Sequence, residues 1–252
     1  MLKELHQASQ YLAAAAISFT EAESDDSHTN LGWSEKYNSL FTRSLNQNNV
    51  MLALCYDDLS LQWIDASWNE LDILYLSERK HHEVLAWLKE KSKKHVGDVS
   101  YNYKFHYDLP YEKITDDYIF QPVDEHEVTK IIRLTTTAKQ AFELLNEKIP
   151  GGYEIRVWPH HFDLASFIEL SDALSVGIGL AIPDDMLDEH YYYVTGWNKD
   201  ESLATDGFRA LPDGEWKNNG WKGAVLKAEN NGVEHVYHFI SSAIEIFKEQ
   251  SH

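Results

Sequence analysis

Two adjacent histidines followed by an aspartate form the stretch of this sequence that could most directly do chemistry. Residues 157–170 read V-W-P-H-H-F-D-L-A-S-F-I-E-L, with aromatic residues on both sides of the histidine pair. On a β-strand, His161 and Asp163 would face the same way, whereas His160 would point with Trp158 to the other face. Imidazole and carboxylate suit Zn²⁺, Fe²⁺ and Mn²⁺. The spacing therefore favours His161 and Asp163 as members of a site, with His160 as their neighbour.

The same histidine pattern occurs twice more in the chain. H-Y-D-L at 106–109 repeats the H-F-D-L of 161–164, and H-T-N-L at 28–31 repeats it more loosely. If the three copies converge, His28, His106 and His161 could bind a divalent metal. Asp163 or Asp108 would then be a further ligand or the base that activates a metal-bound water. The alternative is that each histidine only forms a hydrogen-bonded pair with its neighbouring Asp or Asn and fixes the end of a strand.

A second set of side chains combines aromatic rings with carboxylates. Its candidate ligand-binding members are Trp158, His160, Asp184, Asp185, Glu189, Tyr192 and Trp197. Such a set could hold a sugar or a cationic group by stacking and cation–π attraction. Alternatively, the aspartates are turn residues that bond nearby backbone N–H groups, and the aromatic rings belong to the core.

The elements that must position these residues are short strands between helices. Helical periodicity of apolar residues predicts amphipathic helices over 2–19, 77–94, 124–145 and from Asn231 to the end. Strands are expected at 39–45, 50–56, 59–64, 71–76, 99–106, 154–161, 164–170, 175–182, 190–196 and 223–228. The pattern predicts an α+β fold of antiparallel sheets with flanking helices.

The two halves of the chain follow the same order of elements. V-M-L-A-L-C-Y-D-D from residue 50 can be laid beside V-G-I-G-L-A-I-P-D-D from residue 176. This favours an internal duplication of helix, four strands and helix. Residues 1–97 would form the first copy, 98–123 a connecting strand and loop, and 124–252 the second copy, packed as one compact unit. Two strand hairpins could also resemble each other by chance.

Composition excludes several classes of protein. A net charge of −19, from 41 acidic against 22 basic residues, would repel phosphate backbones and anionic lipids, so neither nucleic acid nor a membrane is an expected partner. Cys55 is the only cysteine, which excludes an internal disulfide and a cysteine-based zinc cluster. Phosphate-binding, dinucleotide-binding and serine-hydrolase motifs are absent from the sequence. We expect an acidic cytoplasmic protein.

Four segments resemble the signature segments of an uncharacterised family of bacterial cytosolic proteins: D-D-S-H-T-N-L-G-W, H-Y-D-L-P, W-P-H-H-F-D-L-A and S-V-G-I-G-L. The resemblance covers most of the chain and implies a bacterial, soluble setting but no activity. The sequence leaves three hypotheses for function. They are a hydrolase-like enzyme with a metal at the His/Asp site, a non-catalytic protein that binds a small molecule, and a structural or oligomerising domain.

Overall fold

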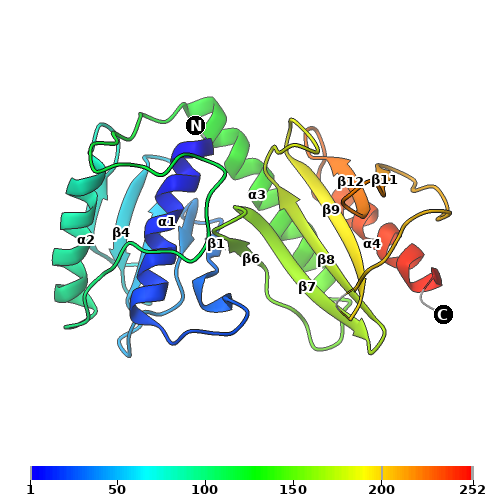
Figure 1. The fold of residues 1–252 in the computed structure, drawn as a ribbon, viewed down its shortest axis with the longest axis horizontal. Helices are drawn as coiled ribbons and strands as arrows, with labels where there is room; N and C mark the ends of the chain where they lie inside the picture. Colours follow the sequence, from blue (N-terminus) through cyan, green and yellow to red (C-terminus); the bar gives the residue numbers. More distant parts are fainter. Residues whose placement is uncertain (1, 200, 251–252) are drawn as a thin grey trace. The chain divides into compact units, whose positions relative to one another are not determined.

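The computed structural model describes residues 2–199 and 201–250, and these form an α+β fold with two antiparallel sheets and four α-helices (Figure 1). This confirms the predicted class of antiparallel sheets with flanking helices. The described chain divides into two compact units. The first unit comprises residues 2–132 and 157–161, and the second comprises 133–156 and 162–250. Each unit contains one of the two sheets, except that Val157 and Trp158 of the seven-stranded sheet fall in the first unit.

The first unit is built on a five-stranded antiparallel sheet. Its elements are α1 (Leu2–Phe19), a 3₁₀ helix (Ser27–Thr29), β1 (Gly32–Ser34), β2 (Ser39–Phe41), β3 (Met51–Cys55), β4 (Ser60–Ile64), β5 (Glu70–Tyr75) and α2 (His81–His95). Each strand pairs with the next along the chain, and the four predicted strands of this half are confirmed as β2 to β5. Fully buried Leu54 and Leu61 lie opposite each other on β3 and β4. Helix α1 packs on β3, and α2 packs on β5.

Helix α1 is buried far more completely than an amphipathic surface helix. Every residue from Glu4 to Ala16 is buried, including polar residues on the side expected to face water. Residues 98–123 run along α1 and cover this side of the helix (Figure 1). The strand predicted at 99–106 is wrong, because this segment forms no sheet ladder and packs its tyrosines on the helix instead. The Tyr101 hydroxyl, for example, donates to the backbone oxygen of Tyr11 at 3.1 Å.

The second unit has a seven-stranded sheet with the order β11-β12-β9-β8-β7-β6, and β10 pairs with β9. Its elements are the larger part of α3 (Glu125–Asn146), β6 (Arg156–Trp158), β7 (Asp163–Ser171), β8 (Leu174–Ala181), β9 (Tyr191–Asn198), β10 (Glu201–Ser202), β11 (Glu215–Lys217), β12 (Gly223–Lys227) and α4 (Val233–Gln250). The division between the units falls within α3 and β6. At the start of α3, Asp124 accepts the N–H groups of His126 and Glu127 at 3.0 Å each and so caps the helix.

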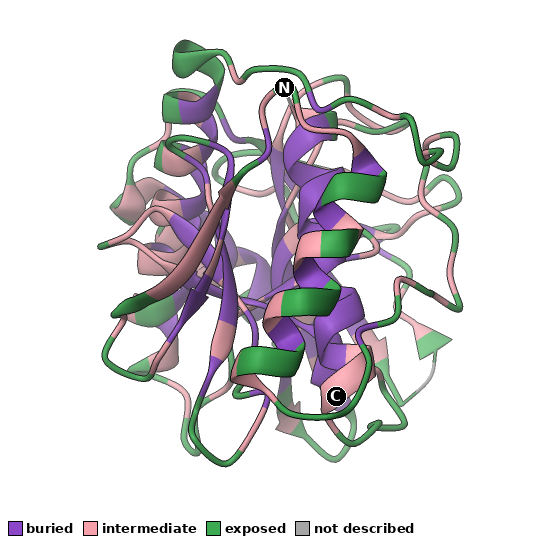
Figure 2. Cartoon of the chain, turned by 90° about the vertical axis from the view of Figure 1, so that its left-hand side faces the viewer, coloured by how far each residue is buried: buried purple, intermediate pink, exposed green. Residues whose placement is uncertain are grey.

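Close packing of α4 on β8 and β9 forms the core of the second unit. The Phe247 ring lies directly over Gly196 of β9, where an added Cβ would come within 2.4 Å of the ring. A side chain at position 196 would therefore push α4 away from its sheet. In Figure 2, which is viewed from the left-hand side of Figure 1, the buried residues, in purple, concentrate on the strands and on one side of the exposed helices.

The predicted repeat of helix, four strands and helix is not confirmed. The two sheets have five and seven strands in the described chain, and β12 is inserted between β9 and β11 in the second. Residues 98–123, expected to connect two copies, belong to the first unit. Within the described residues, no helix is both long enough and apolar enough to cross a membrane.

Candidate functional site

The histidine pair lies in a tight turn between β6 and β7. Residues 159–162 form the turn, and Phe162 has a left-handed φ of 58°. Pro159 cannot donate to a ladder and ends β6 directly after Trp158. Strand alternation therefore does not apply to His160 and His161, and the expectation that His161 shares a strand face with Asp163 does not hold.

Two side chains of α1 fix this turn. The carbonyl oxygen of Pro159 accepts hydrogen bonds from Nε2 of His6 and Nε2 of Gln10, both at 2.8 Å. These residues are four apart, so they lie on the same face of the helix. The Tyr107 hydroxyl donates to Oε1 of Gln10 at 2.8 Å. Helix α1 therefore positions the histidine turn and residues 98–123 together.

His6 is neutral at neutral pH. Its side chain is fully buried, and burial lowers its pKa to about 4, with repulsion from His161 and His160 acting in the same direction and the bond to Pro159 opposing it. The carbonyl of Pro159 can only accept, so Nε2 of His6 carries the proton. Nδ1 then accepts from the Tyr111 hydroxyl, at 3.3 Å. His6 is thus a structural support of the turn.

His160 is the centre of a group of rings at this turn. Its ring centroid lies 4.2 Å from that of His161, 5.6 Å from Tyr107 and 6.0 Å from Trp158. Burial lowers the pKa of His160. The nearby His161 and His106 also lower it, whereas the carboxylate of Asp26 raises it. The imidazole of His160 is therefore a neutral group that can both donate and accept a hydrogen bond.

The Asp26–His106 pair completes what we call the histidine cluster: Asp26, His106, Tyr107, Trp158, His160 and His161. Nε2 of His106 lies 2.9 Å from Oδ2 of Asp26, and both side chains are partly exposed, at 56% and 44%. The His106 ring also contacts that of Tyr107, with centroids 5.3 Å apart. The Tyr107–His160 contact brings together the segments of His106 and His161.

His28, from the third copy of the histidine pattern, lies beside this cluster, and its ring already accepts a hydrogen bond. Leu31 and Val157 form an antiparallel bridge with two backbone hydrogen bonds of 2.9 Å, which places residues 28–31 next to the histidine turn. His28 is buried, and its Nδ1 accepts the N–H of Glu23 at 3.2 Å. In the part of the chain that the structure describes, no three His, Cys, Asp or Glu side chains are arranged to hold a metal ion.

The two proposed catalytic aspartates have other partners. Asp163 belongs to the second unit, where its Oδ2 accepts from the Tyr193 hydroxyl at 2.6 Å. Asp108 is exposed and forms an ion pair of 3.1 Å with Lys113. The hydrogen bond of Asp163 and the ion pair of Asp108 therefore do not support the predicted role of either aspartate as a catalytic base.

The second candidate set is divided between the units. Trp158 and His160 belong to the first unit, and the remaining members, Asp184, Asp185, Glu189, Tyr192 and Trp197, belong to the second. Asp184 accepts backbone N–H groups of its own turn and the hydroxyl of Tyr191 at 2.6 Å, while Asp185 is exposed. Glu189 pairs with Lys227 at 2.5 Å. These carboxylates have the contacts expected of turn and surface residues.

The two aromatic residues of the second unit differ in environment. Tyr192 is fully buried in the core, whereas Trp197 is half-buried and donates from Nε1 to Oγ1 of Thr195 at 2.9 Å. Tyr191, the preceding residue of β9, is also buried. Their positions confirm the alternative that a row of tyrosines includes core residues.

Sequence reasoning missed two members of the histidine cluster, Asp26 and Tyr107, and the two residues of α1 that position its turn, His6 and Gln10. The spacing of His6 and Gln10 could have indicated a shared polar face on a helix, but nothing in the sequence identifies Pro159 as their partner. Asp26 lies beside the singled-out His28, and Tyr107 lies inside the H-Y-D-L motif.

Comparisons of the chain with family models, with curated proteins and with solved structures find no match.

Proposed function

We propose that the chain is a small-molecule-binding protein and that the histidine cluster binds a polyhydroxylated, sugar-like ligand. The main support is the contact of the His160 ring with the rings of Tyr107, Trp158 and His161, next to the Asp26–His106 pair. Aromatic faces can pack against the C–H groups of a sugar ring. The imidazoles and the carboxylate can bond its hydroxyl groups as donors and acceptors.

The charges of the cluster favour a neutral ligand. His160 is kept neutral by burial, and Asp26 already has His106 as a partner. A strongly cationic or anionic ligand would have to compete with that pair. A hydroxyl group can instead share the remaining lone pairs and protons of Asp26 and His106 without breaking the bond between them.

Titration with sugars, followed by NMR of the histidine ring signals, tests this proposal. We expect glucose, galactose, N-acetylglucosamine or maltose to shift the signals of His106 and His160. Trp158→Ala should weaken binding about tenfold, because it removes one aromatic face worth about 1.4 kcal/mol. The proposal is wrong if none of these sugars shifts either histidine.

A matched control is available in the second unit. His235 lies 3.1 Å from Asp213, a partly exposed pair of the same kind as Asp26–His106. Unlike His106, it has no ring contact within the described chain. His235→Ala should leave the sugar response unchanged, whereas His106→Ala should reduce it. Equal effects of both variants would contradict a specific role for the histidine cluster.

A divalent-metal site with hydrolytic activity is the second candidate, favoured by the approach of the His106 and His161 segments. It would require His106, His160 and His161 to turn toward a common point. Addition of Zn²⁺ or Mn²⁺ to chelator-treated protein tests this: a rise in melting temperature that His161→Ala abolishes would support the metal site over the sugar site. An unchanged melting temperature would contradict it.

The proposal also covers the cellular location of the protein and the origin of its two units. We infer a bacterial, cytoplasmic protein in which the two units arose by duplication. The presence in each unit of one antiparallel sheet with a helix packed on it supports this history.

A further inference from the structure

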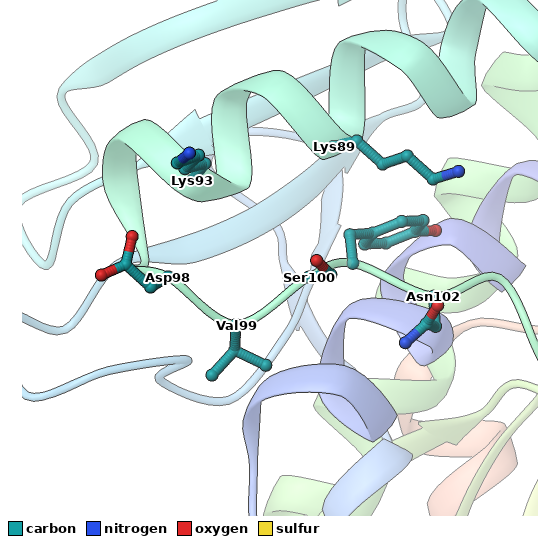
Figure 3. Close-up of a pocket in the computed structure, with 7 residues that line it drawn as sticks. Lys89, Lys93, Asp98, Val99, Ser100 and Asn102 are labelled. Atoms are coloured by element: carbon teal, nitrogen blue, oxygen red, sulfur yellow. The ribbon is translucent and has the colours of Figure 1, made fainter.

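A pocket of about 380 Å³ lies between α2 and the segment that follows it in the first unit (Figure 3). Lys89 and Lys93 line it from α2, and Asp98, Ser100 and Asn102 line it from the opposite side. In Figure 3, Lys93 and Asp98 lie toward one end, and Lys89 and Asn102 lie toward the other. The pocket is separate from the histidine cluster, with which it shares no residue.

Among the described residues, the two lysines of the pocket have no carboxylate partner. Lys89 and Lys93 are four residues apart, so they lie on one face of α2. In residues 2–199 and 201–250, no carboxylate oxygen lies within 4.0 Å of either ammonium. Lys91 and Lys94 of the same helix, in contrast, both pair with Asp72, at 3.1 and 2.8 Å. Both lysines are exposed, and in a chain with 41 acidic and 22 basic residues they are available to pair with an anion.

Compensation of the helix dipole does not explain both lysines. Lys93 lies in the last turn of α2, where a cation is favourable next to the carbonyl end. Lys89 lies six residues before the final residue, His95, and the dipole effect is confined to the last turn. The helix dipole therefore accounts for Lys93 but not for Lys89.

The opposite wall supplies hydrogen-bonding groups. The hydroxyl of Ser100 and the side-chain amide of Asn102 can both donate to an anionic oxygen, and Asp98 can accept from a hydroxyl or ammonium group. The described chain offers the Ser100 hydroxyl no hydrogen-bond partner. A volume of about 380 Å³ is within the usual range for small-molecule pockets and exceeds the needs of a single inorganic ion.

We propose that this pocket binds a small organic anion whose oxyanion group draws the flexible side chains of Lys89 and Lys93 together from the two ends of the pocket, and whose body carries a hydroxyl or amino group for Asp98. The oxyanion can be a phosphate or a carboxylate, since both accept hydrogen bonds from two ammonium groups. This site is independent of the proposed sugar site, and either can exist without the other.

Backbone NMR titrations with glycerol phosphate, malate and inorganic phosphate test the proposal. We expect glycerol phosphate or malate to shift the amide signals of residues 98–102 and to bind more tightly than inorganic phosphate, which lacks an organic body. The relative affinities of glycerol phosphate and malate identify the oxyanion. Lys89→Gln and Lys93→Gln should each weaken binding at least tenfold.

Lys94→Gln is the control, because it removes the same charge from the same helix without touching the pocket. It should leave the affinity unchanged within about twofold. The proposal is overturned if none of the three anions shifts residues 98–102, or if Lys94→Gln weakens binding as much as Lys89→Gln. The second result would show a response to the net charge of α2 alone.

Discussion

Helices α1 and α4 are each 18 residues long and each packs on the sheet of its own unit, but they are buried in different ways. All thirteen residues from Glu4 to Ala16 of α1 are buried, and five of them are polar: Glu4, His6, Gln7, Ser9 and Gln10. The buried residues of α4 are all apolar: Val236, Phe239, Ile240, Ala243, Ile244, Ile246 and Phe247.

The polar face of α1 is bonded to side chains far away in the sequence. Glu4 accepts from the Tyr118 hydroxyl at 2.6 Å and from the N–H of Gln121 at 3.2 Å, while His6 and Gln10 bond Pro159. Satisfied buried bonds add little net stability, but breaking one leaves a costly unpaired group. Helix α1 is therefore fixed in one position by specific bonds, whereas apolar area holds α4.

The largest effect should come from removing the main apolar anchor of α4. Phe247 is fully buried and makes edge contacts with Phe208 and Trp216, with ring centroids 5.5 and 5.4 Å away. We expect Phe247→Ala to lower the free energy of unfolding by about 3–5 kcal/mol, because it leaves a cavity over Gly196. Urea denaturation measures this change.

Phe167→Ala is the control for this prediction. Phe167 is in the same unit on β7 but is 57% exposed, so its loss should change stability by about 0.5 kcal/mol or less. Comparable losses for the two variants would show that apolar burial by α4 does not dominate the second unit.

A smaller effect, specific to α1, should appear in the pH dependence of stability. His6 has a pKa of about 4 in the folded chain against 6.5 when unfolded. The neutral, buried form of His6 therefore makes its full contribution to the free energy of unfolding above pH 6.5. As the pH falls toward 4, the unfolded chain takes up a proton that the folded chain refuses, so the free energy of unfolding falls by about 3 kcal/mol. Denaturation curves between pH 4 and 7 measure this loss.

His6→Gln should reduce that pH dependence, because glutamine does not titrate and can still donate to Pro159. Part of the slope should remain, since burial also lowers the pKa of His81 and His160. Phe247→Ala should lower stability equally at all these pH values. If the free energy of unfolding of His6→Gln changed with pH as steeply as that of the original protein, the pH response would not come from His6 on α1.

Most helices and strands could be predicted from the sequence because their signals are local. The apolar periodicity of α3 and the Asp124 cap lie within the helix or next to it, and β2 to β5 are separated by clear turn residues. The failures concern long-range partners. Residues 99–106 have the composition of a strand, but whether they join a sheet or cover α1 depends on which backbone groups are available to pair with them.

The candidate site was predictable at the level of segments and not of atoms. The repeated His-x-Asp-Leu pattern singled out two segments that lie together, because Tyr107 contacts His160, but their convergence on a metal stays a prediction. The roles of the individual histidines could not be read, because Pro159 turns the chain where strand alternation was assumed. That turn makes His160 the centre of the cluster and leaves Asp163 bonded to Tyr193.

The smallest effect should come from Asp108, the aspartate that the repeated pattern singled out in the first unit. Asp108 and Lys113 are both highly exposed, at 82% and 88%, so water screens their attraction. Asp108→Asn should change the free energy of unfolding by less than about 0.5 kcal/mol and leave sugar-induced shifts of His106 intact. Asp26→Asn, which weakens the bond to His106, should alter those shifts. If Asp108→Asn instead abolished them and Asp26→Asn did not, the functional carboxylate would be the one in the repeated motif, and the contacts of the histidine cluster would not define the site.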